Sequence, residues 1–212
     1  MMIESNKTLP DHTKLDYDEC CAFLILKELF PERYNSLKIA DKPDLQGDKI
    51  GIEVTIASDK KYQEALNNWV KANACEDDNK KQKYIERMSQ LGVRYTGGIQ
   101  AWPGQVPSFK YVRESVKSKV TKLNKGNYAK FEEYELFIFT DTWMHEDIVQ
   151  EAAEYFETNQ IFDFYRKIYI LEKGYLLFIF EKSNVDCIEI DISEQTDRNI
   201  RARKMVELAE DE

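Results

Sequence analysis

The sequence predicts one α/β domain built on a central mixed β-sheet with helices against it. Two hydrophobic patterns alternate along the 212 residues. Residues 15–30 form a largely apolar stretch of helical length, whereas residues 50–56 alternate apolar and polar side chains as a strand does. The continuous apolar run at 136–139 is typical of a strand with both faces covered by helices. Because 42% of the residues are hydrophobic, the chain can bury a sizeable core, and a single domain is expected.

The expected core spans about residues 15–140. A buried helix at 15–30 ends at Pro31, and short strands follow between residues 37 and 56, with a turn at Asp48. A second helix begins after Ser108 and ends at Gly126, because Gly commonly terminates a helix. It leads directly into the strand at 134–140.

Two further regions surround this core. Residues 60–108 are expected to form an insertion, with helices interrupted near 75–79 and a loop rich in Gly and Pro. The C-terminal extension, 141–212, should add a helix at 143–156, a hairpin around Lys173, a half-exposed strand at 187–193 and a charged helix from Glu194.

Several functional classes are disfavoured by composition. No segment reaches the roughly 20 apolar residues of a membrane span, and the N-terminus lacks a basic start followed by an apolar run. The four cysteines have no zinc-binding spacing, which fits a reducing cytoplasm. With two histidines in the chain, carboxylate chemistry is the more open possibility for a site.

The charge is distributed unevenly. The chain carries a net charge of -9, yet residues 79–130 hold twelve basic residues and two acidic ones. A basic segment in an acidic protein is what a polyanion-binding face requires, although a solvated helix face explains such lysines equally well.

Three carboxylates and one lysine stand out as candidate site residues. Asp44 and Glu53 fall on neighbouring strands and could share one Mg²⁺, which favours oxygen ligands. Glu19 falls on the apolar stripe of the first helix, and Lys119 lies at the edge of the stripe of a later helix. Each also has an ordinary explanation. Asp44 could be a turn residue and Glu53 a solvent-facing strand residue. Glu19 could be an acid favoured in the first turn of a helix, and Lys119 a lysine that extends from the edge of the stripe into solvent.

The order of these residues resembles a known family. Glu19, then KPDLQGDKIGIEVT (42–55), then the helix SVKSKVTKL (115–123) leading into ELFIFT (135–140), is similar to the PD-(D/E)xK nuclease superfamily, which has the restriction-endonuclease-like fold. The resemblance implies that Glu19, Asp44 and Glu53 are the metal-binding acids. It also implies a lysine that positions or activates the attacking water.

Thr55 stands where that lysine would be, which is a departure from the family pattern. Threonine cannot supply positive charge, although its hydroxyl could orient a water. Within the superfamily the lysine can move to the neighbouring helix, so Lys119 is the preferred substitute. Lys122 and Lys49 are the second and third candidates.

The resemblance implies a metal-dependent nuclease that uses Mg²⁺, or Mn²⁺ in its place. Its expected partner is nucleic acid, DNA in preference to RNA, and a homodimer is an expectation because many members of the superfamily act as dimers. Backbone contacts are expected from four residues on one helix: Lys110, Arg113, Lys117 and Lys122. Two alternatives stay open: a catalytically inactive nuclease fold that binds nucleic acid or protein, and an ordinary α/β protein with unrelated surface acids.

Overall fold

The computed structural model describes residues 9, 13–95, 99–101, 108–126 and 128–211. The chain separates into two compact units. The larger unit contains residues 13–57 and 107–212, and the smaller one contains residues 1–12 and 58–106, as far as these are described. All of the predicted site residues belong to the larger unit.

The larger unit is built on a seven-stranded mixed sheet in the order β1-β2-β3-β6-β7-β8-β9. The three central strands, β3, β6 and β7, run parallel, and the remaining pairs are antiparallel. The strands are β1 (Lys38–Ile39), β2 (Leu45–Gln46), β3 (Ile50–Ala57), β6 (Glu133–Thr140), β7 (Lys167–Glu172), β8 (Leu176–Glu181) and β9 (Asn184–Glu189).

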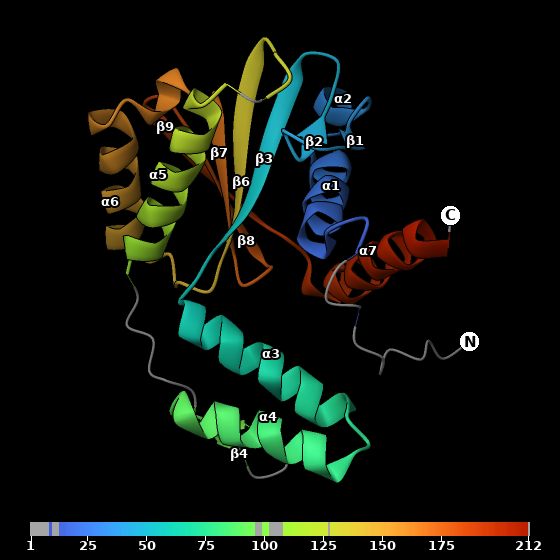
Figure 1. The fold of residues 1–212 in the computed structure, drawn as a ribbon. Helices are drawn as coiled ribbons and strands as arrows, with labels where there is room; N and C mark the ends of the chain where they lie inside the picture. Colours follow the sequence, from blue (N-terminus) through green and yellow to red (C-terminus); the bar gives the residue numbers. More distant parts are fainter. Residues whose placement is uncertain (1–8, 10–12, 96–98, 102–107, 127, 212) are drawn as a thin grey trace. The chain divides into compact units, whose positions relative to one another are not determined.

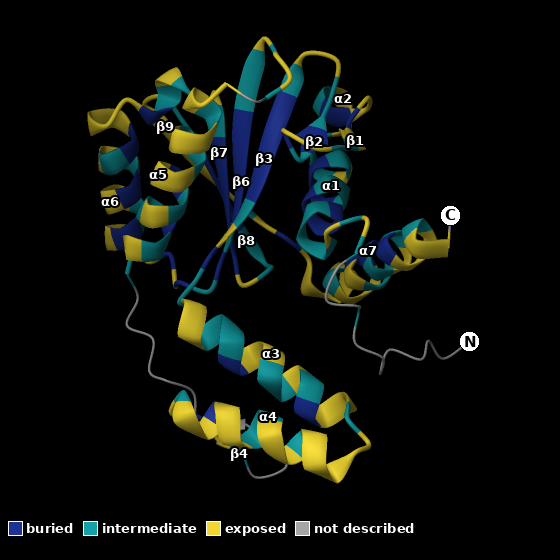
Figure 2. Ribbon diagram, viewed as in Figure 1, coloured by how far each residue is buried: buried dark blue, intermediate teal, exposed yellow. Residues whose placement is uncertain are grey.

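Helices cover both faces of this sheet (Figure 1). Helices α5 and α6 lie on one face, and α1, α2 and α7 lie on the other. The central strands are buried between these layers (Figure 2), which explains the unbroken apolar run in β6. The helices are α1 (Tyr17–Leu29), α2 (Pro31–Tyr34), α5 (Lys110–Asn124), α6 (Glu146–Thr158), the short 3₁₀ helix η1 (Ile161–Asp163) and α7 (Ile192–Asp211).

Side-chain caps fix the starts of the two helices that border the site. The carboxylate of Asp16 accepts hydrogen bonds from the backbone N–H groups of Asp18 and Glu19, so α1 begins at Tyr17. Near the start of α5, the Ser108 hydroxyl accepts one from the N–H of Lys110. The helix expected over 15–30 begins at Tyr17, and the helix expected after Ser108 begins at Lys110, so both predicted starts are confirmed to within two residues.

The smaller unit is a helical pair with a two-stranded sheet. Its elements are α3 (Lys60–Ala74), α4 (Asp78–Gln90), β4 (Arg94–Tyr95) and β5 (Ile99–Ala101). The expected interruption near 75–79 falls at Cys75–Asp77, where Asp77 caps α4 by accepting from Asn79 N and Lys80 N. The helices pack through Ala65, Ala72 and Met88.

Three predicted elements of the C-terminal extension are shifted along the chain. Helix α6 begins at Glu146 rather than 143, because His145 still has an extended backbone. Strand β9 covers 184–189 rather than 187–193, because a tight turn at Lys182–Ser183 places Asn184 directly opposite Glu181. Helix α7 already begins at Ile192, where the Asp191 carboxylate accepts from the N–H of Ser193.

The predicted α/β class, with a mixed sheet flanked by helices, is confirmed. The finer expectation, a restriction-endonuclease-like fold, stays a prediction. Of the helices in the described part of the chain, none combines the length and the apolar character needed to cross a membrane.

Candidate active site

Asp44 and Glu53 are brought together by the β2–β3 ladder. Leu45 pairs with Ile52 and Gln46 with Gly51, so the same antiparallel register places Asp44 opposite Glu53. The backbone N–H of Val54 donates to Asp44 Oδ2 at 2.7 Å, which fixes the Asp44 carboxylate against β3. The prediction that these acids lie on neighbouring strands is confirmed for Glu53, whereas Asp44 lies just before the first residue of β2.

Gly51 allows this approach. A Cβ at Gly51 would lie 2.6 Å from Pro43 Cγ and 2.8 Å from Phe131 Cδ2, distances that real Cβ atoms essentially never show. The absence of a side chain therefore lets the segment before Asp44 pack directly on β3. Sequence periodicity marks Gly51 only as a small residue in a strand.

Lys119, on α5, joins the two acids. Its Nζ donates to Glu53 Oε2 at 2.5 Å and to Asp44 Oδ2 at 3.2 Å. All three side chains are largely enclosed, with exposed fractions of 11% for Lys119, 19% for Asp44 and 2% for Glu53. Asp44 and Glu53 are therefore parts of one enclosed cluster, and the alternative of unrelated surface acids does not describe them.

Burial and charge set the protonation of this cluster. Burial raises the pKa of Glu53, and the ammonium of Lys119 offsets only part of that rise. Burial also disfavours the charged form of Lys119, but the carboxylates of Asp44 and Glu53 more than compensate, so the pKa of Lys119 is raised. Lys119 is thus an ammonium at neutral pH.

One oxygen of this cluster has no partner. Oε1 of Glu53 is buried and accepts no hydrogen bond, although Oε2 is held by Lys119. A buried carboxylate oxygen without a donor is unfavourable unless a ligand or a cation completes it. This free oxygen is the feature of the cluster best suited to a divalent cation.

Of the three candidate lysines, the structure brings Lys119 to the acids. Lys49 instead pairs with Glu132 at 3.2 Å and is 70% exposed, and Lys122 is exposed on α5. Thr55 is partly buried and shares the face of β3 with Glu53, since strand residues two apart point to the same side. The role of Thr55 stays a prediction.

Glu19 interacts with the acids over a longer distance. Burial raises the pKa of Glu19 to about 8, and the negative charge of Asp44 adds to the rise. Among the described residues, no three His, Cys, Asp or Glu side chains are placed to hold one metal ion together. Glu19 is therefore close enough for the charges of Asp44 and Glu53 to raise its pKa. Its role as a metal ligand stays a prediction.

The basic residues predicted to contact a nucleic-acid backbone lie along α5 as expected. Arg113 forms an ion pair with Glu151 at 2.5 Å, and its guanidinium lies over the ring of Phe109. Lys110, Lys117 and Lys122 are exposed. Their contact with nucleic acid stays a prediction.

Sequence reasoning missed two tyrosines near the cluster. Burial raises the pKa of Tyr128 to about 12, and the charge of Glu53 and a hydrogen bond with its carboxylate add to this rise. Burial also raises the pKa of Tyr165, with contributions from Glu53 and Asp44. Both lie outside any recognisable motif, so no sequence signal identifies them.

A second buried polar cluster lies on the opposite face of the sheet. The Glu135 carboxylate is fully buried and accepts from the Tyr34 hydroxyl at 2.5 Å and from Arg33 Nη2 at 2.5 Å. Tyr34 also shares a hydrogen bond with Tyr169 at 2.5 Å. Because the partners satisfy one another, this cluster fixes α2 to the sheet.

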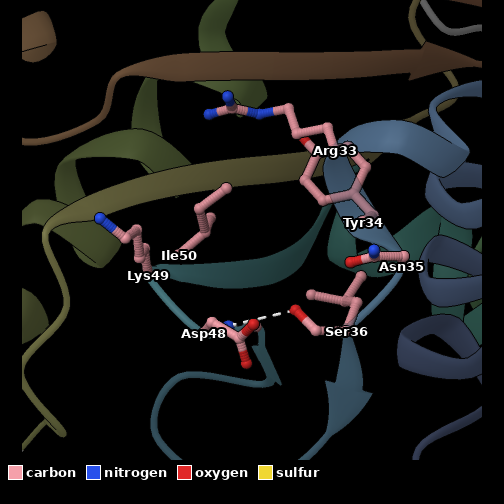
Figure 3. Close-up of a pocket in the computed structure, with 9 residues that line it drawn as sticks. Arg33, Tyr34, Asn35, Ser36, Asp48, Lys49 and Ile50 are labelled. Atoms are coloured by element: carbon pink, nitrogen blue, oxygen red, sulfur yellow. Dashed lines mark hydrogen bonds between the residues drawn. The ribbon is translucent and has the colours of Figure 1, made fainter.

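A pocket of about 190 Å³ lies beside this second cluster (Figure 3). The N–H of Asp48 donates to the Ser36 hydroxyl there at 3.3 Å. Glu133 and Glu135 neutralise Arg33, and Glu132 pairs with Lys49, so the lining offers no excess positive charge for a phosphate. The pocket is lined by Arg33, Tyr34, Asn35, Ser36, Leu37, Gly47, Asp48, Lys49 and Ile50.

Comparison of the chain with protein-family models, with curated proteins and with solved structures gave no match. The functional conclusion therefore depends on the geometry of the site.

Proposed function

We propose that this protein is a metal-dependent nuclease that hydrolyses phosphodiester bonds, with DNA as the favoured substrate and RNA as the other. The observation that supports this most is the enclosed Asp44–Glu53–Lys119 cluster with one carboxylate oxygen left free. We further propose that it acts in the cytoplasm and as a homodimer, which would allow cleavage of both strands.

The donor set fits a hard divalent cation such as Mg²⁺ or Mn²⁺. Two carboxylates are sufficient when water and substrate phosphate complete the coordination, and Glu53 Oε1 is buried without a donor. Asp44 and Glu53 would hold the cation, with water and substrate phosphate as its other ligands. When bound, the cation would polarise the phosphate and make water more acidic.

Lys119 would supply the positive charge that Thr55 cannot. Because the pKa of Lys119 is raised, the side chain is protonated and acts as a donor rather than as a general base. An ammonium held in an enclosed site stabilises the negative charge that develops on phosphate during hydrolysis. Thr55 would orient a water through its hydroxyl.

The second candidate function is an inactive nuclease fold that binds nucleic acid or protein. Thr55 favours it, as does the cluster itself, because Lys119 already neutralises much of the charge of Asp44 and Glu53 without a metal. In that case the exposed lysines of α5 would remain the binding face.

Cleavage assays on single- and double-stranded DNA and RNA separate the two functions. With Mg²⁺ or Mn²⁺, Asp44→Asn and Glu53→Gln should each lose about 100-fold or more in rate. Asp48→Asn, in the exposed turn of the same hairpin, is the matched control and should retain activity. The wild-type protein could instead cleave none of the four substrates and still bind nucleic acid in a salt-dependent way. That result would overturn the proposed nuclease activity and support the inactive fold.

A further inference from the structure

A tryptophan, a histidine and a lysine form an exposed platform where the central strands of the sheet end. Trp143 and His145 follow β6, and Lys173 lies in the turn between β7 and β8. The ring of His145 lies parallel to that of Trp143, with an interplanar angle of 6° and 6.2 Å between the ring centroids. Nζ of Lys173 lies over the Trp143 ring, 3.5 Å from its centroid. Trp143 is still 46% exposed, so its indole remains open to a further planar group.

Buried hydrogen bonds hold the backbone beneath this platform. Glu172 is 2% exposed, and its Oε2 accepts from the backbone N–H of Met144 at 2.8 Å. The N–H of Lys173 donates to the carbonyl of Thr140 at 3.0 Å, which joins the β7–β8 turn to the end of β6. The segments that carry Trp143 and Lys173 are therefore fixed to each other before any ligand binds, and such preorganisation favours binding.

Lys173 has a backbone conformation that lysine rarely adopts. Its φ is +48°, and Gly174 follows with a φ of +87° in the turn closed by the hydrogen bond from Tyr175 N–H to the Glu172 carbonyl. Asn or Gly is the usual residue at the first of these two positions, because an L side chain is strained at positive φ. A lysine at this strained position is accounted for if its ammonium over Trp143 has a function.

The platform adjoins the start of the basic helix α5. The hydroxyl of Thr142 donates to the carbonyl of Ser108, just before α5, at 3.3 Å. Figure 1 shows the start of α5 and the β6–α6 connection at the same end of the sheet. Lys119 lies nine residues after Lys110, the first residue of α5, which corresponds to about 14 Å along the helix axis. A nucleic-acid strand that extends from the site along α5 would therefore reach Trp143 within a few nucleotides.

The chemistry of the platform fits a nucleobase better than a phosphate. Three acidic residues, Asp141, Glu146 and Asp147, flank it in the chain, and their charge disfavours a phosphate at this point. An aromatic face with a cation beside it attracts the uncharged ring of a base, and every base has such a face. In a duplex the faces of a base are covered by its neighbours, so the platform requires an unpaired base.

We propose that Trp143, His145 and Lys173 form a stacking subsite for an unpaired nucleobase, a few nucleotides from the phosphate that is cleaved. This inference rests on the proposed function, because it takes nucleic acid as the ligand, and it adds that the strand is single or locally unpaired at the platform. Stacking on aromatic side chains tolerates any base, so the subsite would recognise an unpaired strand without recognising its sequence.

Binding of two labelled DNA strands by the full chain, measured by fluorescence anisotropy without divalent metal, tests the subsite. One probe is a single strand of mixed sequence, and the other is an abasic strand with the same number of phosphates. Wild type should bind the strand with bases about 10-fold more tightly, because stacking requires a base whereas the phosphate contacts are shared. Trp143→Ala should remove this preference and leave the affinity for the abasic strand unchanged. Leu208→Ala, at an exposed apolar residue of α7, is the matched control and should keep the preference.

Lys173→Asn separates binding from a structural role of the turn. Asparagine is favoured at this position, so the variant should be at least as stable as wild type in urea unfolding. It should nevertheless lose about 3-fold of the preference for the strand with bases, because the cation beside the indole is gone. Lys182→Asn makes the same change of charge in the exposed β8–β9 turn and should leave the preference as it is.

The outcomes distinguish the subsite from the nuclease. Equal binding of the two strands by wild type, or a preference that persists in Trp143→Ala and Lys173→Asn, would overturn the subsite, and cleavage by wild type would still support the nuclease. A wild-type protein that cleaves none of the substrates, but whose preference for bases is lost in Trp143→Ala, would refute the nuclease and support the subsite.

Discussion

Replacing Lys119 with methionine is the most informative perturbation of the site. Methionine keeps the length and the helix propensity of the side chain but removes the ammonium that bridges Asp44 and Glu53. Two enclosed carboxylates are then left facing each other without a cation. At neutral pH they must stay charged at close range, take up a proton or move apart.

The expected loss of stability follows from the enclosure of the three groups. Removing one partner of a buried ion pair typically costs about 3–5 kcal/mol, because the remaining charge is left unpaired. Glu53 is 2% exposed and Asp44 is 19% exposed, so solvent relieves Asp44 in part. We therefore expect Lys119→Met to lose about 3 kcal/mol at pH 8. The loss should be smaller near pH 5, where Glu53, with its raised pKa, can be protonated.

Urea unfolding with and without Mg²⁺ measures this effect. Lys122→Met is the matched control, because Lys122 is an exposed lysine on the same helix, and it should change stability by less than about 0.5 kcal/mol. If Asp44 and Glu53 bind Mg²⁺, the ion should restore part of the stability of Lys119→Met by binding the folded state. Equal stability of the two variants at pH 8 would refute the bridging role of Lys119.

Two further predictions test how the acids are placed and charged. Gly51→Ala should lower stability by about 1–3 kcal/mol in urea unfolding and reduce the rate of cleavage, because the added Cβ would collide with Pro43 and shift Asp44. Cleavage by the variant at the wild-type rate would contradict this. Glu19→Gln should remove a fall in stability between about pH 5 and pH 8. The folded state keeps a proton on Glu19 that the unfolded chain loses, so stability decreases as pH rises through this window. The full pKa shift would correspond to several kcal/mol, but partial exposure of Glu19 reduces the expected difference in stability at pH 8 to about 1–2 kcal/mol. Parallel curves of stability against pH for the two proteins would exclude this contribution of Glu19.

The parts of the site that the sequence predicts are those with a regular period. The alternation from Ile50 to Ile56 shows which side chains of β3 share a face, and it therefore predicts the face on which Glu53 lies. The helical spacing between Val116 and Lys119, on a helix that begins near Ser108, likewise predicts that Lys119 lies at the edge of the buried face. Both depend on local geometry, so one sequence is enough to predict them.

The parts that the sequence does not predict depend on contacts between distant segments. Tyr165 lies far along the chain from Glu53, and the effect of the Glu53 charge on its pKa depends on where β7 joins the sheet. The pairing of Glu135 with Arg33 on α2 is equally non-local, and the isolated residues carry no motif. In the sequence Gly51 is an ordinary strand residue, and its role becomes visible only from the packing of Pro43 against it.

The placement of the positive charge bears most directly on the choice between an enzyme and a binding module. A lysine on β3 would be fixed by the strand that carries Glu53, whereas Lys119 reaches both acids from α5. Buried ion pairs often stabilise a fold no more than apolar residues of similar volume would, so stability alone is a weak reason for this cluster. A purely structural cluster would also be expected to satisfy its buried oxygens, as Glu135 does with Arg33 and Tyr34. Glu53 leaves Oε1 free in the same sheet, and this contrast is the physical reason for preferring a site that completes itself with a ligand.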